Sequence, residues 1–480
     1  MNTLKSMVTT LKHELQPALL ITKREVRDQF RDWRVIFPIV GLTAFFPFLM
    51  NLTVQQIINF VQKYGATLVA DRMVPFLLMI VGFFPISVSL VISLDTFVGE
   101  KERGSIEPLL DSPLKDWQLY LGKLLASTIP PVVGSYLGMI VYIVGLLFRD
   151  INMPDMWVII IIFVLTTIQG LMMVSGAVVV SSQATSVRAA NLLASFIIIP
   201  SALLMQIESL VMFWGSSINI LWWFILGLLI LSFLLIRIGL SHFKREELLG
   251  REIDVLNIKW ILQSFWQSFT GKAKSFWKWY QIEIISTIKQ MKISIPITMF
   301  LILTGFTIGW FLLNQFPIPI NMPTIDEFNK NIEFLINTDF LSGGFTLKVL
   351  FQNLRVVAMI GLLGFLTFGI AGTFPLLFTT AVIGYLFHLL TVNGLPAAYL
   401  CALLLPHGIF EIPAIFLSTA AILHASAYIV APVENKTVGE VWIEAVAFWL
   451  KITLGISFPL LFLASIVEIF ITPKIVLFFF

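Results

Sequence analysis

The sequence predicts an all-α, polytopic integral membrane protein with about eleven transmembrane helices in two helical modules, plus amphipathic interfacial helices. Of its 480 residues, 58% are hydrophobic and only 12% are charged, which is more apolar surface than a soluble core needs. Apolar runs of about 20 residues, the length of a membrane span, recur from Val35 onward. The runs are continuous rather than alternating. They therefore predict helices, which satisfy their own backbone polar groups in lipid, and exclude a β-barrel.

The predicted spans form two groups. The first group is a set of six spans near residues 35–54, 74–95, 124–148, 156–180, 190–213 and 219–240. The second group lies near residues 293–316, 352–373, 375–392, 397–430 and 446–471. Within 397–430, Pro406, Gly408 and Pro413 interrupt the apolar run, and proline removes a backbone donor, so the assignment of this region as one span stays open.

Basic residues predict the orientation of the chain in a plasma membrane. Lys and Arg are abundant before the first span and between the second and third spans, so the N-terminus and that loop are expected in the cytoplasm. A basic amphipathic segment, 251–292, is expected on the same side, as a connector between a first module, 1–250, and a second, 293–480. The acidic segment 317–344 is expected outside.

Two polar segments read as surface helices. Before the first span, apolar residues recur at spacings of three, four or seven while basic residues occupy the other face, which predicts a helix lying on the cytoplasmic leaflet. In the connector, aromatic and basic residues alternate between Trp260 and Trp279. Such interleaving also occurs in single-strand nucleic-acid binders. The position between membrane modules and the net charge of +3 favour the lipid bilayer, and no nucleic-acid partner is expected.

The segment from Glu100 to Ala126 is the most informative stretch of the chain. It is charged, then helix-like, is broken by Pro108 and Pro113, and returns to the membrane at Gly122. A short, stiff cytoplasmic element of this kind can transmit force, because packed helices move as rigid bodies. The same residues are equally compatible with an ordinary amphipathic loop held by Glu and Lys pairs at the surface.

This segment resembles the cytoplasmic loop of type-2 ABC exporter permeases. The matching residues are Glu100, Lys101, Glu102, Arg103, Gly104, Ser105, Glu107, Leu109, Leu110, Ser112, Pro113, Gly122 and Lys123. The resemblance covers about residues 15–250. It implies that six helices form half of a dimeric transport path, completed by a second copy or a second permease subunit. It also implies an ATPase-coupling loop that docks on a separate ABC ATPase and contains Glu100, Lys101, Glu102, Arg103, Gly104, Glu107, Pro108, Leu109, Leu110 and Pro113.

The chain is not expected to be an enzyme. A phosphate-binding G-x-x-x-x-G-K-[ST] sequence is absent, because Gly122-Lys123 precedes Leu124 and Gly271-Lys272 precedes Ala273. ATP and magnesium are therefore expected on the partner subunit, with no cofactor on this chain. The sequence also lacks a Gly-x-Ser-x-Gly nucleophile elbow. The single cysteine, Cys401, lies in an apolar run and allows neither an intrachain disulfide nor a cysteine zinc cluster.

The second module resembles the stage II sporulation protein M family over about residues 285–471. The matching motifs are Gln352-Asn353-Leu354-Arg355-Val356 and Pro406-His407-Gly408-Ile409-Phe410-Glu411-Ile412-Pro413-Ala414. Gln352 replaces an Asn of the family pattern but keeps the amide. The resemblance implies work with partner membrane or cell-wall proteins and leaves the biochemical activity open.

His407, Glu411 and Arg355 are the intramembrane polar candidates. His407 and Glu411 are four residues apart and share a helix face, where a charge is costly unless it is paired with the other residue or with Arg355. A structural pair, a proton or substrate relay and a metal site are the alternatives. One His and one Glu are too few ligands, so no metal site is predicted. Three further polar residues, His388, His424 and Glu468, are expected to hydrogen-bond between helices.

Three functional hypotheses follow. The first is the transmembrane subunit of an ABC exporter, driven by a separate ATPase, with an accessory second module. The alternative is a non-transporting membrane scaffold for peptide immunity or envelope-remodelling partners. A third is an intramembrane peptidase that uses His407 and Glu411. The substrate stays open between peptide, lipid, drug and ion.

Overall fold

A computed structural model gives the structure of the chain. It describes residues 2–64, 67–104, 111–149, 151, 153–184, 186, 190–191, 195–214, 218–243, 257–315, 330, 343–394, 396–431 and 436–479. The described elements are all helical, which confirms the predicted all-α class. The chain divides into two compact units, Met1–Leu256 and Asn257–Phe480, and each is described by itself.

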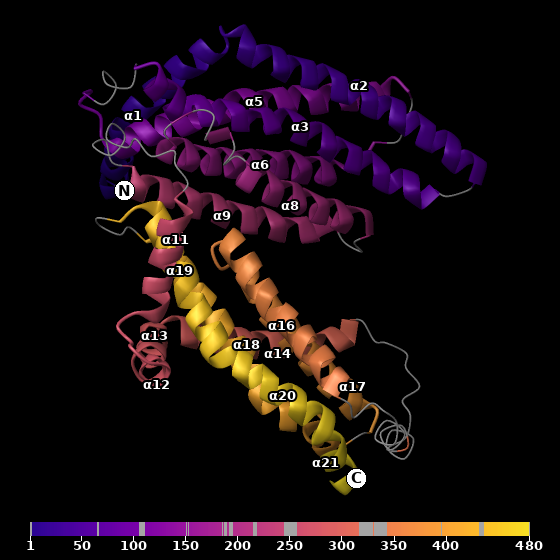
Figure 1. The fold of residues 1–480 in the computed structure, drawn as a ribbon. Coiled ribbons are helices and arrows are strands. Elements are labelled where there is room, and N and C mark those ends of the chain that lie inside the picture. The colour runs from indigo at the N-terminus through magenta and orange to yellow at the C-terminus, as the bar shows by residue number, and fades with distance from the viewer. Residues whose placement is uncertain are drawn as a thin grey trace. The chain divides into compact units, whose positions relative to one another are not determined.

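The first unit is a bundle of long helices (Figure 1). Its described helices are α1 (Asn2–Gln29), α2 (Trp33–Tyr64), α3 (Thr67–Glu102), α5 (Asp116–Leu147), α6 (Met156–Gln183), α8 (Ser195–Trp214) and α9 (Leu221–His242), with a short turn η1 (Ile218–Ile220) before α9. Helix α3 lies at the centre, because it packs against α2, α5, α6 and α8. Helix α1 packs on α5 and places the N-terminal amphipathic segment against the bundle.

The second unit is built around α18. Its described elements are α11 (Ile258–Thr270), α12 (Phe276–Lys278), η2 (Trp279–Ile284), α13 (Ile285–Gln290), α14 (Ser294–Gln315), α16 (Gly343–Leu366), η4 (Ala371–Thr373), α17 (Phe374–Val392), α18 (Ala397–Val430), α19 (Val438–Ile452), η5 (Thr453–Ser457), α20 (Phe458–Phe470) and α21 (Thr472–Phe479). Helix α18 contacts α14, α16, α17, α19, α20 and α21. Pro406 and Pro413 lie inside α18, which continues through both.

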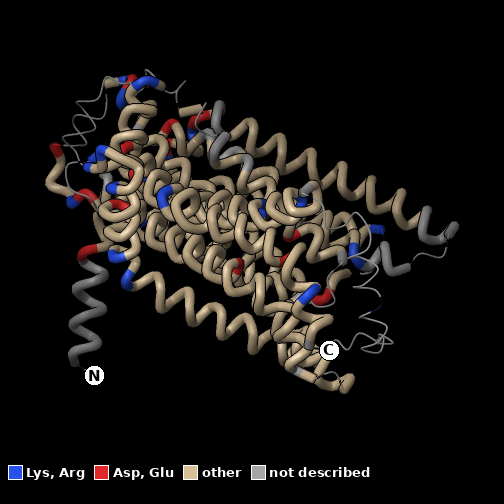
Figure 2. Tube along the Cα trace, turned by 60° about the horizontal axis from the view of Figure 1, so that its bottom comes forward, with Lys and Arg blue, Asp and Glu red and all other residues tan. Residues whose placement is uncertain are grey.

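Ten described helices are long and apolar enough to cross a membrane. Helix α8 adds a shorter described apolar stretch, Pro200–Phe213, at the place of the fifth predicted span. Long stretches of the helices carry neither acidic nor basic residues (Figure 2). Hydroxyl groups within these stretches donate to carbonyls of their own helix, as Thr96 does to Ile92 and Thr298 to Ser294, so they need no external partner. The polytopic membrane prediction is confirmed.

Glycines bring α14 and α17 into backbone contact. A Cβ atom at Gly309 would lie on the carbonyl of Ala381, and one at Gly384 would lie on the carbonyl of Phe306. Gly305 likewise faces Thr380 without space for a side chain. Gly305 and Gly309 form a G-x-x-x-G sequence, the motif by which membrane helices approach closely.

Candidate functional site

A fully buried lysine lies at the end of the first unit that the charge pattern predicts to face the cytoplasm. Lys123, near the start of α5, has no exposed side-chain surface, and its Nζ lies 2.7 Å from Oε1 of Glu100 on α3. Oε1 of Glu25 on α1 is 3.7 Å from the same nitrogen. The ammonium group also donates to the carbonyl of Thr96 at 3.2 Å. Lysine is almost never buried without such partners, so this one cation joins three helices.

Gly122 allows α1 to pack directly on α5. A Cβ atom at this position would come 2.9 Å from the backbone oxygen of Ala18 and 2.9 Å from Cβ of Ile21. At the same place the hydroxyl of Thr22 donates to the carbonyl of Gly122 at 3.1 Å. Gly122 therefore allows the close approach of α1, and the adjacent Lys123 forms an ion pair with Glu25 of that helix.

An aromatic cluster lies beneath the lysine. Phe97, Tyr120 and Phe243 are buried against one another, with ring centroids 5.2 Å apart for Phe97 and Phe243 and 5.8 Å apart for Tyr120 and Phe243. Val174 and Val178 of α6 complete the cluster. The Nζ of Lys123 is 5.3 Å from the Phe97 centroid, within cation–π range. Displacement of the end of α3 is thus resisted by α5, α6 and the residue that follows α9.

Exposed ion pairs surround this buried site. Arg103 bonds Asp95 at 2.7 Å, and Lys115 bonds Glu14 at 2.8 Å. The amide of Gln118 donates to the carbonyl of Glu14 at 2.7 Å and accepts from the backbone of Lys115 at 3.0 Å. Exposed pairs contribute little stability on their own, about 0–1 kcal/mol. Here they fix where the chain re-enters the bundle at the start of α5.

The structure locates most of the predicted coupling residues. Glu100, Lys101 and Glu102 form the last turn of α3, and Arg103 and Gly104 follow it. Gly104 has a φ of +67°, the left-handed conformation that commonly ends a helix. Pro113 is exposed in the turn before α5. The other predicted residues, Glu107, Pro108, Leu109 and Leu110, lie outside the described residues, and their role stays a prediction.

Sequence reasoning missed two members of the site, Lys123 and Glu25. Lys123 belongs to the motif that resembles the permease loop, but the motif alone assigns it no role. A lone lysine at the start of an apolar run is itself a signal of buried pairing. Glu25 lies within a stretch that has five cationic residues between positions 23 and 34, and only the packing of α1 on α5 distinguishes it from a solvent-exposed acid.

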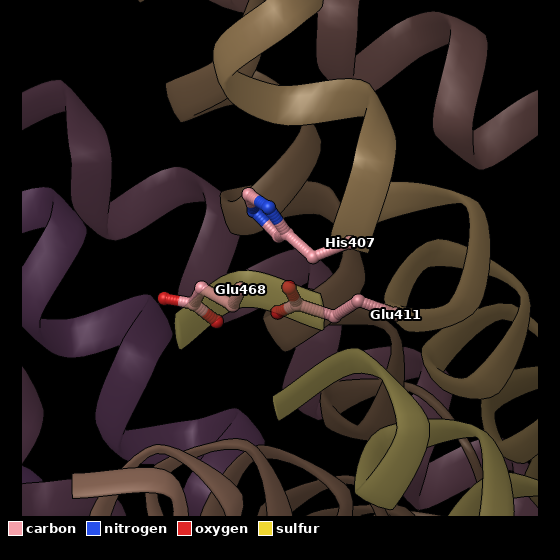
Figure 3. Close-up of side chains that lie close together, drawn as sticks. All are labelled: His407, Glu411 and Glu468. Carbon is pink, nitrogen blue, oxygen red and sulfur yellow. The ribbon is translucent and has the colours of Figure 1, made fainter. Parts of the chain in front are cut away.

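In the second unit the structure adds a third side chain to His407 and Glu411. Glu468 of α20 lies beside these two residues of α18 (Figure 3). One ligand atom from each of the three lies within 4.8 Å of the others. Arg355 of α16 is exposed, and among the described residues it forms no ion pair with His407 or Glu411. The pairing considered for Arg355 is therefore absent from this structure.

The remaining intramembrane histidines contact neighbouring helices. Nδ1 of His388 lies 2.6 Å from the carbonyl of Trp310, and its ring stacks on the indole with centroids 4.6 Å apart. His388 is thus a helix–helix hydrogen-bonding residue, as predicted. The ring of His424 stacks on Phe448, also with centroids 4.6 Å apart.

Two family comparisons cover different parts of the chain. Residues 19–214 match the family described as ABC-2 family transporter protein. Residues 298–473 match the family described as stage II sporulation protein M. An uncharacterized protein of Methanocaldococcus jannaschii is 32% identical over 185 residues, which are 38% of this chain and 97% of that protein. Both resemblances inferred from motifs are confirmed.

Proposed function

Because the first half of the chain belongs to the ABC-2 family transporter proteins and the second half to the stage II sporulation protein M family, we propose that it is the transmembrane subunit of an exporter driven by a separate ABC ATPase. The ATPase docks on the loop that follows α3 and hydrolyses ATP there, on the cytoplasmic side of the plasma membrane. The N-terminus lies on the same side. The observation that carries the proposal is the burial of Lys123 against Glu25 and against Glu100, which lies in the last turn of α3.

The ion pairs of Lys123 with Glu100 and Glu25 join α1, α3 and α5 into a single mechanical element. Moving α1 and α3 away from Lys123 removes both of its carboxylate partners and leaves a buried charge unpaired, which costs about 3–5 kcal/mol. A push on the end of α3 is therefore more easily accommodated by moving α1, α3 and α5 together than by pulling them apart. Nucleotide-dependent contacts of the ATPase then shift the bundle between arrangements, because a partner shifts an equilibrium by its differential affinity for the two states.

Helix α1 anchors these three helices at the membrane surface. Its inner side, including Ala18 and Thr22, is buried against α5, while large apolar residues such as Leu19, Leu20 and Phe30 are exposed. Lys23, Arg24, Arg27 and Arg31 are exposed as well. Apolar residues that enter the interface and cations that meet anionic headgroups hold such a helix in the plane of the leaflet.

The second unit is an accessory membrane module in this proposal. The transport path is completed by a second copy of the chain or by another permease subunit. The family match of the second unit supports partners in the membrane or the cell wall rather than a chemical step on this chain. A scaffold without a transport cycle is the competing function, and the experiment below separates the two.

Co-purification with an ABC ATPase tests the proposal. The full chain is expressed in its own host, purified in mild detergent, and its partners are identified by mass spectrometry and ATPase assay. A variant with Glu102→Lys and Glu107→Lys is expected to insert in the membrane but to lose the ATPase and its stimulation. Lys115→Gln changes an exposed charge outside the loop and serves as the control. A complex with a cell-wall hydrolase and without any nucleotide-hydrolysing subunit would replace the exporter by the scaffold.

A further inference from the structure

We propose that His407, Glu411 and Glu468 form a binding site for a divalent transition-metal cation of the zinc class. The site is independent of the ATPase-coupling loop, since all three residues belong to the second unit. One imidazole nitrogen and two carboxylate oxygens converge there from two helices, within 4.8 Å of one another (Figure 3). The described chain contains no other group of three His, Cys, Asp or Glu side chains with this spacing.

Helix geometry explains the convergence. His407 and Glu411 are one turn apart on α18 and point to the same side. Helix α20 packs along α18 and brings Glu468 opposite this pair. The sequence alone gives two ligands, which is too few, and the packing supplies the third. Three protein ligands with one open position are the arrangement of catalytic and exchangeable zinc sites.

The two carboxylates of the cluster favour the binding of a cation. Two other acids of the second unit have a lysine partner: Lys451 lies 2.7 Å from Glu283, and Lys436 lies 2.6 Å from Glu444. Among the described residues, no Lys or Arg lies within ion-pair distance of Glu411 or Glu468. Two neighbouring carboxylates in an apolar bundle repel each other and are poorly solvated, so a divalent ion bound between them removes both penalties.

A second contact orients the imidazole. Nδ1 of His407 lies 3.2 Å from the hydroxyl of Thr472, which is buried at the start of α21. This hydrogen bond holds the ring and leaves Nε2 for a ligand role. Metal-binding histidines generally have such an outer partner on the second nitrogen. Thr472 is therefore a positioning residue of the site.

The ligand types select the ion. Magnesium and calcium prefer oxygen ligands and need six or more of them, whereas an imidazole with two carboxylates suits zinc, manganese or iron. Around a tetrahedral ion, ligands at about 2.1 Å are about 3.4 Å apart. Small side-chain rotations bring donors that lie within 4.8 Å to that spacing. All three side chains are partly exposed rather than sealed in the interior of the bundle.

Zinc binding by the purified full-length protein tests the proposal. The protein is treated with a chelator, titrated with ZnCl₂ against a competing zinc indicator, and analysed for metal content by mass spectrometry. One zinc ion per chain is expected. His407→Gln and Glu468→Gln should each weaken binding by more than 100-fold, and Thr472→Val by about 10-fold to 100-fold. His424→Gln, on the same helix, should leave the affinity unchanged. The visible spectrum of the cobalt-substituted protein gives an independent readout of tetrahedral coordination.

Three results would overturn the proposal. The first is less than stoichiometric zinc in a folded wild-type sample. The second is the same zinc affinity for wild type, His407→Gln and Glu468→Gln, which would indicate an adventitious ion only. The third is a protein that does not bind zinc and in which Glu411 and Glu468 share a single proton. Thermal unfolding of the metal-free variants checks that each is folded, and Thr472→Val, which keeps all three ligands, tests the site without removing one.

Discussion

Glu283 and Lys451 form an ion pair of 2.7 Å that joins the segment before α14 to helix α19. Both side chains are about nine-tenths buried, and Glu283 also accepts a hydrogen bond from the backbone of Lys272 at 3.0 Å. Burial alone would raise the pKa of Glu283. The hydrogen bond and charge of Lys451, together with the backbone of Lys272, outweigh burial and hold this pKa below its ordinary value.

A pH dependence of stability follows from this lowered pKa. The folded state binds the proton of Glu283 more weakly than the unfolded state, so the pair stabilises the fold above the ordinary Glu pKa of about 4.3. The contribution is lost as the pH falls from that value through the lowered pKa. Glu283→Gln should therefore unfold more easily than wild type at pH 7, with the difference shrinking below about pH 4. Thermal unfolding in nanodiscs across this range measures the difference, and a constant gap would contradict the assignment.

Removal of the buried lysine is expected to destabilise the first unit. Lys123→Met leaves Glu100 and Glu25 facing each other without their cation, at a cost of about 3–5 kcal/mol in the free energy of unfolding. Adding Glu100→Gln to Lys123→Met should restore part of the loss, with a coupling of about 0.5–3 kcal/mol. Chemical denaturation of the single and double variants gives the coupling.

Lys115→Gln is the matched control for the lysine variant. It removes an exposed pair with Glu14 and should change the free energy of unfolding by less than about 1 kcal/mol. Equal effects of Lys115→Gln and Lys123→Met would show that burial of Lys123 does not decide its contribution.

The glycine contact between α14 and α17 predicts a steric effect. Gly309→Leu places a side chain where the carbonyl of Ala381 lies, so the two helices must separate. We expect a loss of at least about 1–3 kcal/mol in the free energy of unfolding, the usual cost of overpacking. Gly408→Ala is the control, because the nearest atom to its added Cβ is 3.8 Å away. Both substitutions raise helix propensity, so comparable losses in the two variants would show that the close contact at Gly309 is not the cause.

The orientation of the chain can be read from thiol labelling. Cys401→Ser gives a cysteine-free background, since Cys401 is the single cysteine of the sequence. Glu102→Cys in that background should react with an impermeant maleimide only after the cells are opened. Lys330→Cys, in the segment expected outside, should react in intact cells. Labelling of Glu102→Cys in intact cells would place the end of α3 on the wrong side for an ATPase.

Local physics was sufficient to predict the helices and most of the spans. A continuous apolar run must satisfy its backbone within the segment, so its length indicates a span without knowledge of its neighbours. Pro406 and Pro413 show the limit of this rule. Each removes a backbone hydrogen bond, so the sequence left open whether 397–430 is one span, yet α18 continues through both because surrounding helices pack on it.

Partners distant in the sequence could not be predicted in the same way. His407 and Glu411 were found from a spacing of four, whereas Glu468 joins them only through the packing of α20 on α18. Likewise the acids that hold Lys123 lie on two other helices. Periodicity describes one helix at a time, and the register between two helices depends on side chains of both.

The close contact between Gly122 of α5 and helix α1 has a consequence for the influence of the lipid bilayer. Because Gly122 has no side chain of its own, α1 packs closely on α5 and cannot change its depth or tilt in the headgroup layer without moving the start of α5. In the proposed exporter, lateral pressure and leaflet composition therefore act on the same helices as the ATPase, so the lipid composition of the bilayer should influence transport.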